Sequence, residues 1–171
     1  MIILYSLFLN LNRTNDFKSN KNNSTNSIVW DNQGANDLVL QAQVIEHNDE
    51  KLEIKIPLKR RTKNHLGSMY FGALAVGADL TGGFLAMNPI QESGRKINLV
   101  FKDFKADFLR RPEGDVHFIC NDGLAVRDLV EKVAKSSDRH NLKLNIDATV
   151  PSLSNEIVAR FELTLSLKDK T

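Results

Sequence analysis

One segment of the chain, Met69–Met87, constrains the fold more than any other. It is apolar almost throughout, and its only charged residue is Asp79. A helix that is hydrophobic on all sides is normally buried. Nineteen such residues can also cross a bilayer, but four glycines and a central carboxylate argue against a membrane span. The sequence therefore predicts a central helix that the rest of the chain surrounds.

The segments on both sides of this helix alternate between apolar and polar residues. That pattern is typical of antiparallel strands with one face in water. It occupies residues 52–58, 97–108, 116–120, 142–150 and 159–167, with a weaker strand over 38–45 that forms a hairpin with the next one. A change of phase at Lys102–Asp103 indicates a β-bulge, and residues 122–134 have the apolar spacing of a short helix. We therefore predict an α+β fold in which about five to six antiparallel strands wrap around one central helix.

The N-terminal part differs in composition from the rest. Residues 12–26 are rich in Asn, Ser, Lys and Thr, with Phe17 as their only large apolar side chain. Such a segment buries too little apolar surface to offset its ordering entropy. We expect a flexible Asn/Ser-rich leader over residues 1–30 and one folded domain over residues 31–171. The apolar residues 1–11 lack the basic start and cleavage site of a secretory signal.

Charge and cysteine content exclude several classes of protein. Twenty-three basic residues against 21 acidic ones give a net charge of +2, which argues against a nucleic-acid partner. The single cysteine, Cys120, excludes an internal disulfide and any multi-cysteine metal site, and it fits a reducing compartment. We expect a cytoplasmic protein. The four histidines lack metal-ligand spacing, so no metal site is predicted, and Cys120 is interpreted as a core residue.

Asp79 is the first candidate for a functional residue. At about 100° per residue, it shares a helix face with mostly small residues: Gly72, Ala75, Val76, Gly82, Gly83 and Ala86. Such a stripe lets another backbone or an extended ligand come close. The helix holds no Lys or Arg, so any partner of the carboxylate must come from elsewhere in the fold or from a second subunit. We interpret Asp79 as a general base or nucleophile facing a pocket; the alternative is a structural carboxylate paired across an interface.

The segment before the helix carries the next candidates. Its basic residues, Lys59, Arg60, Arg61 and Lys63, form either a solvated strand end or a site for ligand phosphate. A helix N-terminus can hold a developing oxyanion through its free N–H groups. The Asn64 side chain either contributes an amide to that site or caps an ordinary turn.

The residues around the helix start resemble the central motif of hotdog-fold thioesterases of the phenylacetyl-CoA thioesterase type. In this chain the motif consists of Asn64, Gly67, Tyr70, Phe71, Gly72 and, seven positions later, Asp79. Tyr70 and Phe71 stand where many relatives have His and Gly. The wider stretch 58–87, with a second motif over 104–115, is similar to an uncharacterised thioesterase branch of that superfamily.

The resemblance implies a hotdog fold and hydrolysis of an acyl thioester. Asp79 would activate water or attack the carbonyl, Gly72 would hold the oxyanion through its N–H, and Asn64 would assist. Substrate-binding roles fall to Gly67, Tyr70, Phe71 and Gly83. The chemistry requires neither a metal nor a redox cofactor, because the coenzyme A or carrier-protein arm belongs to the substrate. The active site would lie between the subunits of a homodimer or tetramer.

Two other functions stay open. The first is a non-catalytic protein that binds acyl thioesters or fatty acyl groups on the same scaffold. The second is a dehydratase or hydratase of acyl thioesters, which the lack of a well-placed Asp/His pair makes the less favoured of the two.

Overall fold

The computed structural model of the protein describes residues 40–170, and the leader predicted over residues 1–30 lies outside them. Six strands and two helices follow one another in the described part. In chain order they are β1 (Gln43–His47), β2 (Leu52–Ile56), α3 (Phe71–Glu92), β3 (Ile97–Phe108), β4 (Val116–Cys120), α4 (Gly123–Ala134), β5 (His140–Val150) and β6 (Ser154–Asp169).

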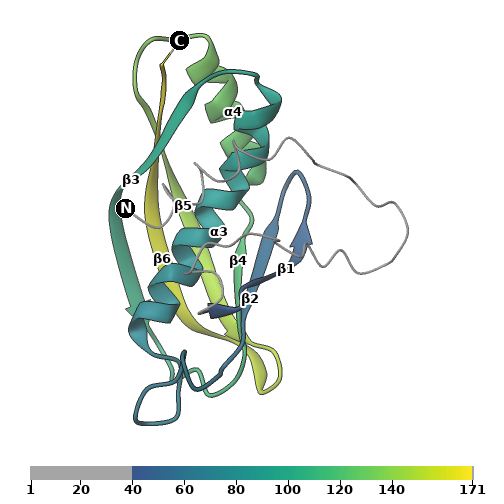
Figure 1. The fold of residues 1–171 in the computed structure, drawn as a ribbon, viewed down its shortest axis with the longest axis vertical. Coiled ribbons are helices and arrows are strands. Elements are labelled where there is room, and N and C mark those ends of the chain that lie inside the picture. The colour runs from purple at the N-terminus through teal and green to yellow at the C-terminus, as the bar shows by residue number, and fades with distance from the viewer. Residues whose placement is uncertain (1–39, 171) are drawn as a thin grey trace, which may run out of the picture.

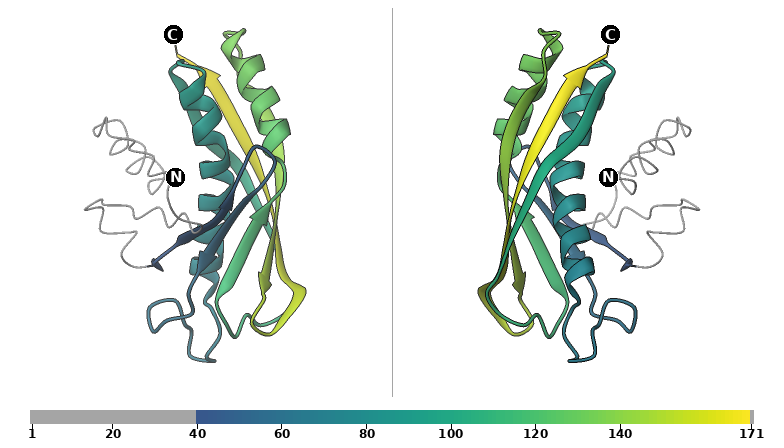
Figure 2. Two further views of the ribbon diagram at one scale, coloured as in Figure 1. Left: turned by 90° about the vertical axis from the view of Figure 1, so that its right-hand side faces the viewer. Right: turned by 90° about the vertical axis from the view of Figure 1, so that its left-hand side faces the viewer.

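All six strands join one antiparallel sheet in the order β1-β2-β4-β5-β6-β3. The long helix α3 runs along one face of this curved sheet, as Figure 1 shows. The shorter α4 packs beside α3 and contacts β5 and β6 (Figure 2). The predicted architecture, an antiparallel sheet around one central helix, is therefore confirmed.

The core lies between α3 and the inner face of the sheet. Its largest fully buried side chains come from β2, β4, β5 and β6 and from Ile97 of β3, with Phe118 and Phe161 the largest of all. A β-carbon at Gly77 would lie 2.3 Å from the ring of Phe118, so this glycine lets α3 approach the sheet closely. Gly82 also faces the sheet, because a β-carbon there would lie 3.2 Å from Leu144 and from Phe101.

The strand boundaries follow the alternation closely. The predicted bulge is confirmed, because the pairing of β3 with β6 shifts between Phe101 and Phe104. In the bulge, the carboxylate of Asp103 accepts a hydrogen bond from the backbone N–H of Thr164 at 3.0 Å. The first strand begins later than predicted, at Gln43, and its side chains are mostly exposed. Exposed strands have little apolar alternation, which explains the error.

Cys120 ends β4 inside the core. Its side chain is fully buried, and burial raises the pKa of the thiol to about 12. The thiol therefore stays protonated at neutral pH, in agreement with its interpretation as a core residue. Within residues 40–170, neither helix combines the length and apolarity needed to cross a membrane.

Candidate active site

Asp79 lies in the middle of α3, on the side turned away from the sheet. The side facing the sheet is marked by Gly77 and by Thr81, which is fully buried. Two residues on from Gly77, a helix has turned by about 200°, so the Asp79 side chain points in nearly the opposite direction. It is nevertheless only partly exposed.

The carboxylate of Asp79 has no ion pair or hydrogen-bond partner among residues 40–170. Burial disfavours the charged form, and this desolvation raises the pKa of Asp79 to about 6. A carboxylate with such a pKa is ionised at neutral pH and is a stronger base than an ordinary aspartate. This combination is typical of a catalytic base.

The start of α3 presents two free backbone donors. The N–H groups of Phe71 and Gly72 bond to no acceptor within the described part of the chain. The carbonyl oxygen of Tyr70 accepts the next two N–H groups, from Ala73 at 3.1 Å and Leu74 at 3.2 Å. A β-carbon at Gly72 would lie 2.4 Å from the Tyr70 ring, so that ring stands directly beside the free donors.

Asn64 and Gly67 form a tight turn just before the helix. The Asn64 side-chain oxygen accepts hydrogen bonds from the N–H groups of Leu66 at 2.9 Å and Ser68 at 3.2 Å. Its amide nitrogen donates to the Ser68 hydroxyl at 3.1 Å. Gly67 has a φ of 84°, in the left-handed region that favours glycine. Asn64 thus caps the turn that leads into α3, and its amide is engaged within that turn.

The candidate residues therefore fall into two groups along α3. Asn64, Gly67, Tyr70, Phe71 and Gly72 cluster at its N-terminal end. Asp79 lies seven residues beyond Gly72, about 10 Å along the helix axis at ~1.5 Å per residue. Gly83 lies one further turn along the same face as Asp79, because residues four apart on a helix are neighbours.

Exposed apolar side chains surround the N-terminal end of α3. Phe71 is 65% exposed and packs edge-on against Phe108, which is 50% exposed, with 6.1 Å between the ring centroids. The neighbouring Leu66, Tyr70, Phe104 and Leu109 are exposed as well. We refer to these six residues as the apolar patch. A cluster of this kind on a surface marks a place that binds a ligand or another protein.

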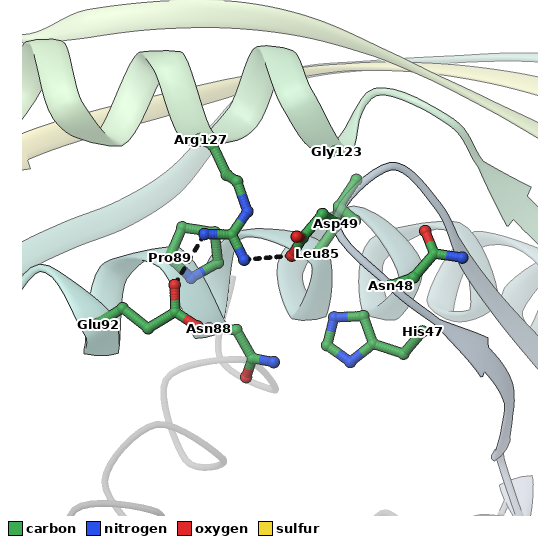
Figure 3. A pocket seen from close by; sticks show the side chains of 9 residues that line it. All are labelled: His47, Asn48, Asp49, Leu85, Asn88, Pro89, Glu92, Gly123 and Arg127. Atoms are coloured by element: carbon green, nitrogen blue, oxygen red, sulfur yellow. Dashed lines mark hydrogen bonds and ion pairs between the residues drawn. The ribbon is translucent and has the colours of Figure 1, made fainter.

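A polar cavity of about 150 Å³ lies at the other end of α3. It is lined by residues of the β1–β2 turn, the last turns of α3 and the first half of α4. Figure 3 shows Arg127 reaching from α4 between Glu92 and Asp49 and bonding to both. Burial, followed by the charge of Arg127, lowers the pKa of His47 beside them. The sequence analysis missed this cluster, because it joins three distant segments and has no local motif.

No group of three or more His, Cys, Asp or Glu residues suited to hold a metal ion occurs among residues 40–170. The polar cavity joins its acidic side chains to a guanidinium. These ion pairs hold α4 against α3 and the β1–β2 turn. The candidate site for catalysis is therefore the part of α3 around Asp79.

Several solved structures share this fold. The protein PA5026 from Pseudomonas aeruginosa, named a probable thioesterase, is 24% identical, covers 75% of this chain and 83% of its own, and superposes with a TM-score of 0.65. The thioesterase HI1161 from Haemophilus influenzae is 18% identical over 78% of this chain and 82% of its own, with a TM-score of 0.60. A protein of unknown function from Chlorobaculum tepidum, OLEI01261, is 13% identical over 77% and 85% of the two chains, with a TM-score of 0.67. The expected hotdog fold is thereby confirmed.

No protein with a curated function matches this sequence. One family does match it, over residues 38–167. This range includes both helices and all six strands, apart from the last residues of β6. That family is described as a domain of unknown function, DUF4442. The chain therefore belongs to the DUF4442 family.

Proposed function

We propose that the protein hydrolyses acyl thioesters and that Asp79 is its base or nucleophile. The observation that carries this proposal is a carboxylate with a pKa of about 6 that forms no ion pair within residues 40–170 and lies in the middle of the apolar segment 69–87. The thioesterase names of PA5026 and HI1161, which share the fold, support the same class of reaction.

In the base mechanism, the Asp79 carboxylate takes a proton from water as the water oxygen adds to the thioester carbonyl. The carbonyl oxygen becomes an oxyanion, which the free N–H groups of Phe71 and Gly72 stabilise. The intermediate then collapses, the carbon–sulfur bond breaks, and the proton on Asp79 passes to the leaving thiolate. The products are a carboxylic acid and a thiol. In the nucleophilic variant, the carboxylate forms an anhydride with the acyl group, which water then cleaves.

The separation of the two groups supports a site made by two chains. A reacting carbonyl must lie within about 3–3.5 Å of its attacking group, whereas Gly72 and Asp79 of one chain are about 10 Å apart along the helix. We propose that Gly72 of one subunit works with Asp79 of the other across a homodimer. The apolar patch supports this arrangement, since the burial of such surface stabilises subunit contacts.

The first experiment is a panel of acyl-CoA thioesters with release of free thiol as the readout. We expect turnover by the native protein and a loss of at least about 100-fold in D79N, the usual scale for removing a general base. D128N is the matched control, because Asp128 is an exposed aspartate on α4 and has no role in the candidate site. Native-like turnover by D79N would refute the assignment of Asp79.

The same proteins test the alternative function. A non-hydrolysable thioester analogue should bind to both the native protein and D79N, because the substitution keeps the size of the side chain. Binding of the analogue without hydrolysis of any thioester in the panel would identify a non-catalytic acyl-binding protein.

The two-chain site has its own test. F71D/F108D places charges in the apolar patch, and we expect it to shift the protein from dimer to monomer in sedimentation experiments and to abolish hydrolysis. L124D is the control, because Leu124 on α4 is also exposed, at 55%, but lies outside the patch. Full activity in a monomeric variant would contradict the two-chain site.

A further inference from the structure

The turn between β2 and α3 carries four cations in five consecutive positions: Lys59, Arg60, Arg61 and Lys63, with Thr62 among them. All four side chains are exposed. None of them forms an ion pair with a residue in the range 40–170. We call this segment, residues 59–63, the basic turn.

The acidic residues at this end of the molecule are already paired. Glu113 pairs with Arg111, Glu156 with Arg110, and Asp115 with Lys55. Asp115 also accepts the backbone N–H of Leu58 at 2.8 Å. Within residues 40–170, no ion pair therefore neutralises the cations of the basic turn.

The backbone of the basic turn is fixed. The N–H of Thr62 donates to the carbonyl of Lys59 at 3.0 Å, which places Arg60 and Arg61 at the tip of a β-turn. The buried hydroxyl of Thr62 donates to the carbonyl of Pro57 at 2.8 Å and accepts the N–H of Lys59, also at 2.8 Å. A charged group held on a fixed backbone loses less entropy when it binds an anion.

The basic turn is also joined directly to the candidate active site. The carbonyl of Thr62 accepts the backbone N–H of Tyr70 at 2.9 Å, and Tyr70 immediately precedes α3. The turn and the start of α3 lie together at the lower end of the molecule in Figure 1. The basic turn therefore lies at the same end of α3 as the free N–H groups of Phe71 and Gly72.

We infer that the basic turn is the subsite that binds the phosphate groups of coenzyme A. This inference rests on the proposed function, because it takes the ligand to be the carrier of the acyl group. Pantetheine has the length of about four extended residues, roughly 14 Å, which separates the phosphates from the reacting carbonyl. Arginine and lysine are the usual partners of phosphate. Coenzyme A has several phosphate charges in a compact group, which four adjacent cations match.

An acyl carrier protein is the competing source of the same pantetheine arm. It presents one phosphodiester at the attachment point, and its recognition would require basic residues spread over about 800 Å² of surface. On this end of the molecule the other basic residues, Arg110 and Arg111, are bound to acids. The concentration of free charge within five residues favours the nucleotide.

The experiment compares K59Q/R60Q/R61Q/K63Q with K96Q/K102Q/K168Q/K170Q. The control removes the same charge from four exposed lysines outside the basic turn. Binding of free coenzyme A and of pantetheine is measured by titration calorimetry, which requires no turnover. We expect the dissociation constant for coenzyme A to rise at least about tenfold in the first variant only, because charge-assisted contacts are lost. Removal of the 3′-phosphate from the ligand should weaken binding to the native protein and reduce the difference between the variants.

A kinetic comparison separates this inference from the proposed function. In the basic-turn variant, the ratio of kcat/KM for acyl-CoA to kcat/KM for acyl-pantetheine should fall at least about tenfold. If the native protein hydrolyses no acyl thioester but its binding of coenzyme A depends on the basic turn, the proposed function is refuted and the phosphate subsite is supported. Asp79-dependent hydrolysis with coenzyme A binding equal in the two variants, or no binding to the native protein, would refute the subsite. The subsite for coenzyme A would also be refuted if only the hydrolysis of acyl carrier protein thioesters depended on the basic turn. That result would identify the protein carrier as the ligand.

Discussion

At the scale of single residues, Asp79 is the strongest candidate for a catalytic role. Its environment combines apolar neighbours along α3 with the absence of any cation partner in residues 40–170. Desolvation of this kind destabilises the charged form and so makes the carboxylate a better proton acceptor. The same physical cause affects both the reaction rate and the stability of the fold, and each effect can be measured separately.

The pH dependence of the rate is the first prediction. As a base, Asp79 must be ionised, so log kcat/KM should rise with slope one below pH 6 and level off above it, since the pKa is about 6. The measurement is initial hydrolysis rates between pH 4.5 and 8. A flat profile over this range would contradict the role of Asp79 as the base.

The second prediction concerns stability. The pKa of Asp79 is higher in the folded state than its ordinary value of 3.8, so the folded state binds more protons between pH 4 and 6. The free energy of unfolding therefore decreases as pH rises through this window. Above pH 6 the ionised carboxylate costs roughly 1 to 2 kcal/mol, allowing for its partial exposure.

D79N removes this cost, because an amide stays neutral. We expect D79N to be more stable than the native protein at pH 8 and to lose most of that advantage at pH 4.5. Urea unfolding at the two pH values measures the difference. An advantage that is equal at both pH values would show that ionisation is not its source.

At the scale of elements, the glycines of α3 determine how close the helix comes to the sheet. Gly77 faces the fully buried ring of Phe118, while Gly72 faces the exposed ring of Tyr70. Both positions are helical, so alanine improves the helix propensity equally, by about 1 kcal/mol. What differs is whether the aromatic neighbour can move.

The third prediction compares G77A with G72A. In G77A the new methyl group overlaps a ring that is packed on all sides, and we expect a net loss of about 2 kcal/mol of stability. In G72A the Tyr70 ring can rotate into solvent, so stability should change by less than about 1 kcal/mol. Thermal unfolding of the two variants decides the matter; equal losses would mean that contact with Phe118 is not the reason for glycine at this position.

The same elements explain what the sequence could and could not predict. Strands with one buried face, such as β5 and β6, alternate cleanly, and the phase change at Lys102–Asp103 located the bulge to the residue. The edge strand β1 buries little and was misplaced by several residues.

The candidate site shows the same division. Asp79 stood out as the only charge in the apolar segment 69–87, whereas the bonding of Asn64 within its turn depends on the positions of Leu66 and Ser68 in three dimensions. The ion pairs that Asp115 and Glu156 form near the basic turn are likewise invisible in the sequence, because their partners lie about 50 to 60 positions away. The local pattern of apolar and polar residues indicates which positions are buried. Hydrogen-bond and ion-pair partners that are distant in the sequence can be identified only from the three-dimensional structure.

At the scale of the whole molecule, Arg127 connects elements that the chain separates widely. Its guanidinium bonds to Glu92 at the end of α3 and to Asp49 in the β1–β2 turn (Figure 3). The N–H of Gly123 supports the same contact by donating to the carbonyl of Glu50 at 3.0 Å. Together these bonds hold the β1–β2 hairpin against the two helices.

The fourth prediction is that R127Q loosens this hairpin. Its ion pairs are partly exposed, so the overall loss of stability should be no more than about 1 kcal/mol. Amide hydrogen exchange in residues 48–51 should nevertheless become faster, because the carboxylates of Asp49 and Glu92 lose their shared cation. K135Q is the control, since the Lys135–Glu131 pair lies at the end of α4, away from the hairpin. If the exchange rates in R127Q do not change, the hydrogen bond from Gly123 to Glu50, and not the ion pairs of Arg127, holds the hairpin in place.

The burial of Cys120 has a practical consequence for work on this protein. It is the only sulfhydryl in the chain, and it is enclosed in the core with little tendency to ionise at neutral pH. Disulfide exchange reagents react with accessible thiolates. A colorimetric assay with such a reagent will therefore report the sulfhydryl released from substrate, with negligible background from the folded protein.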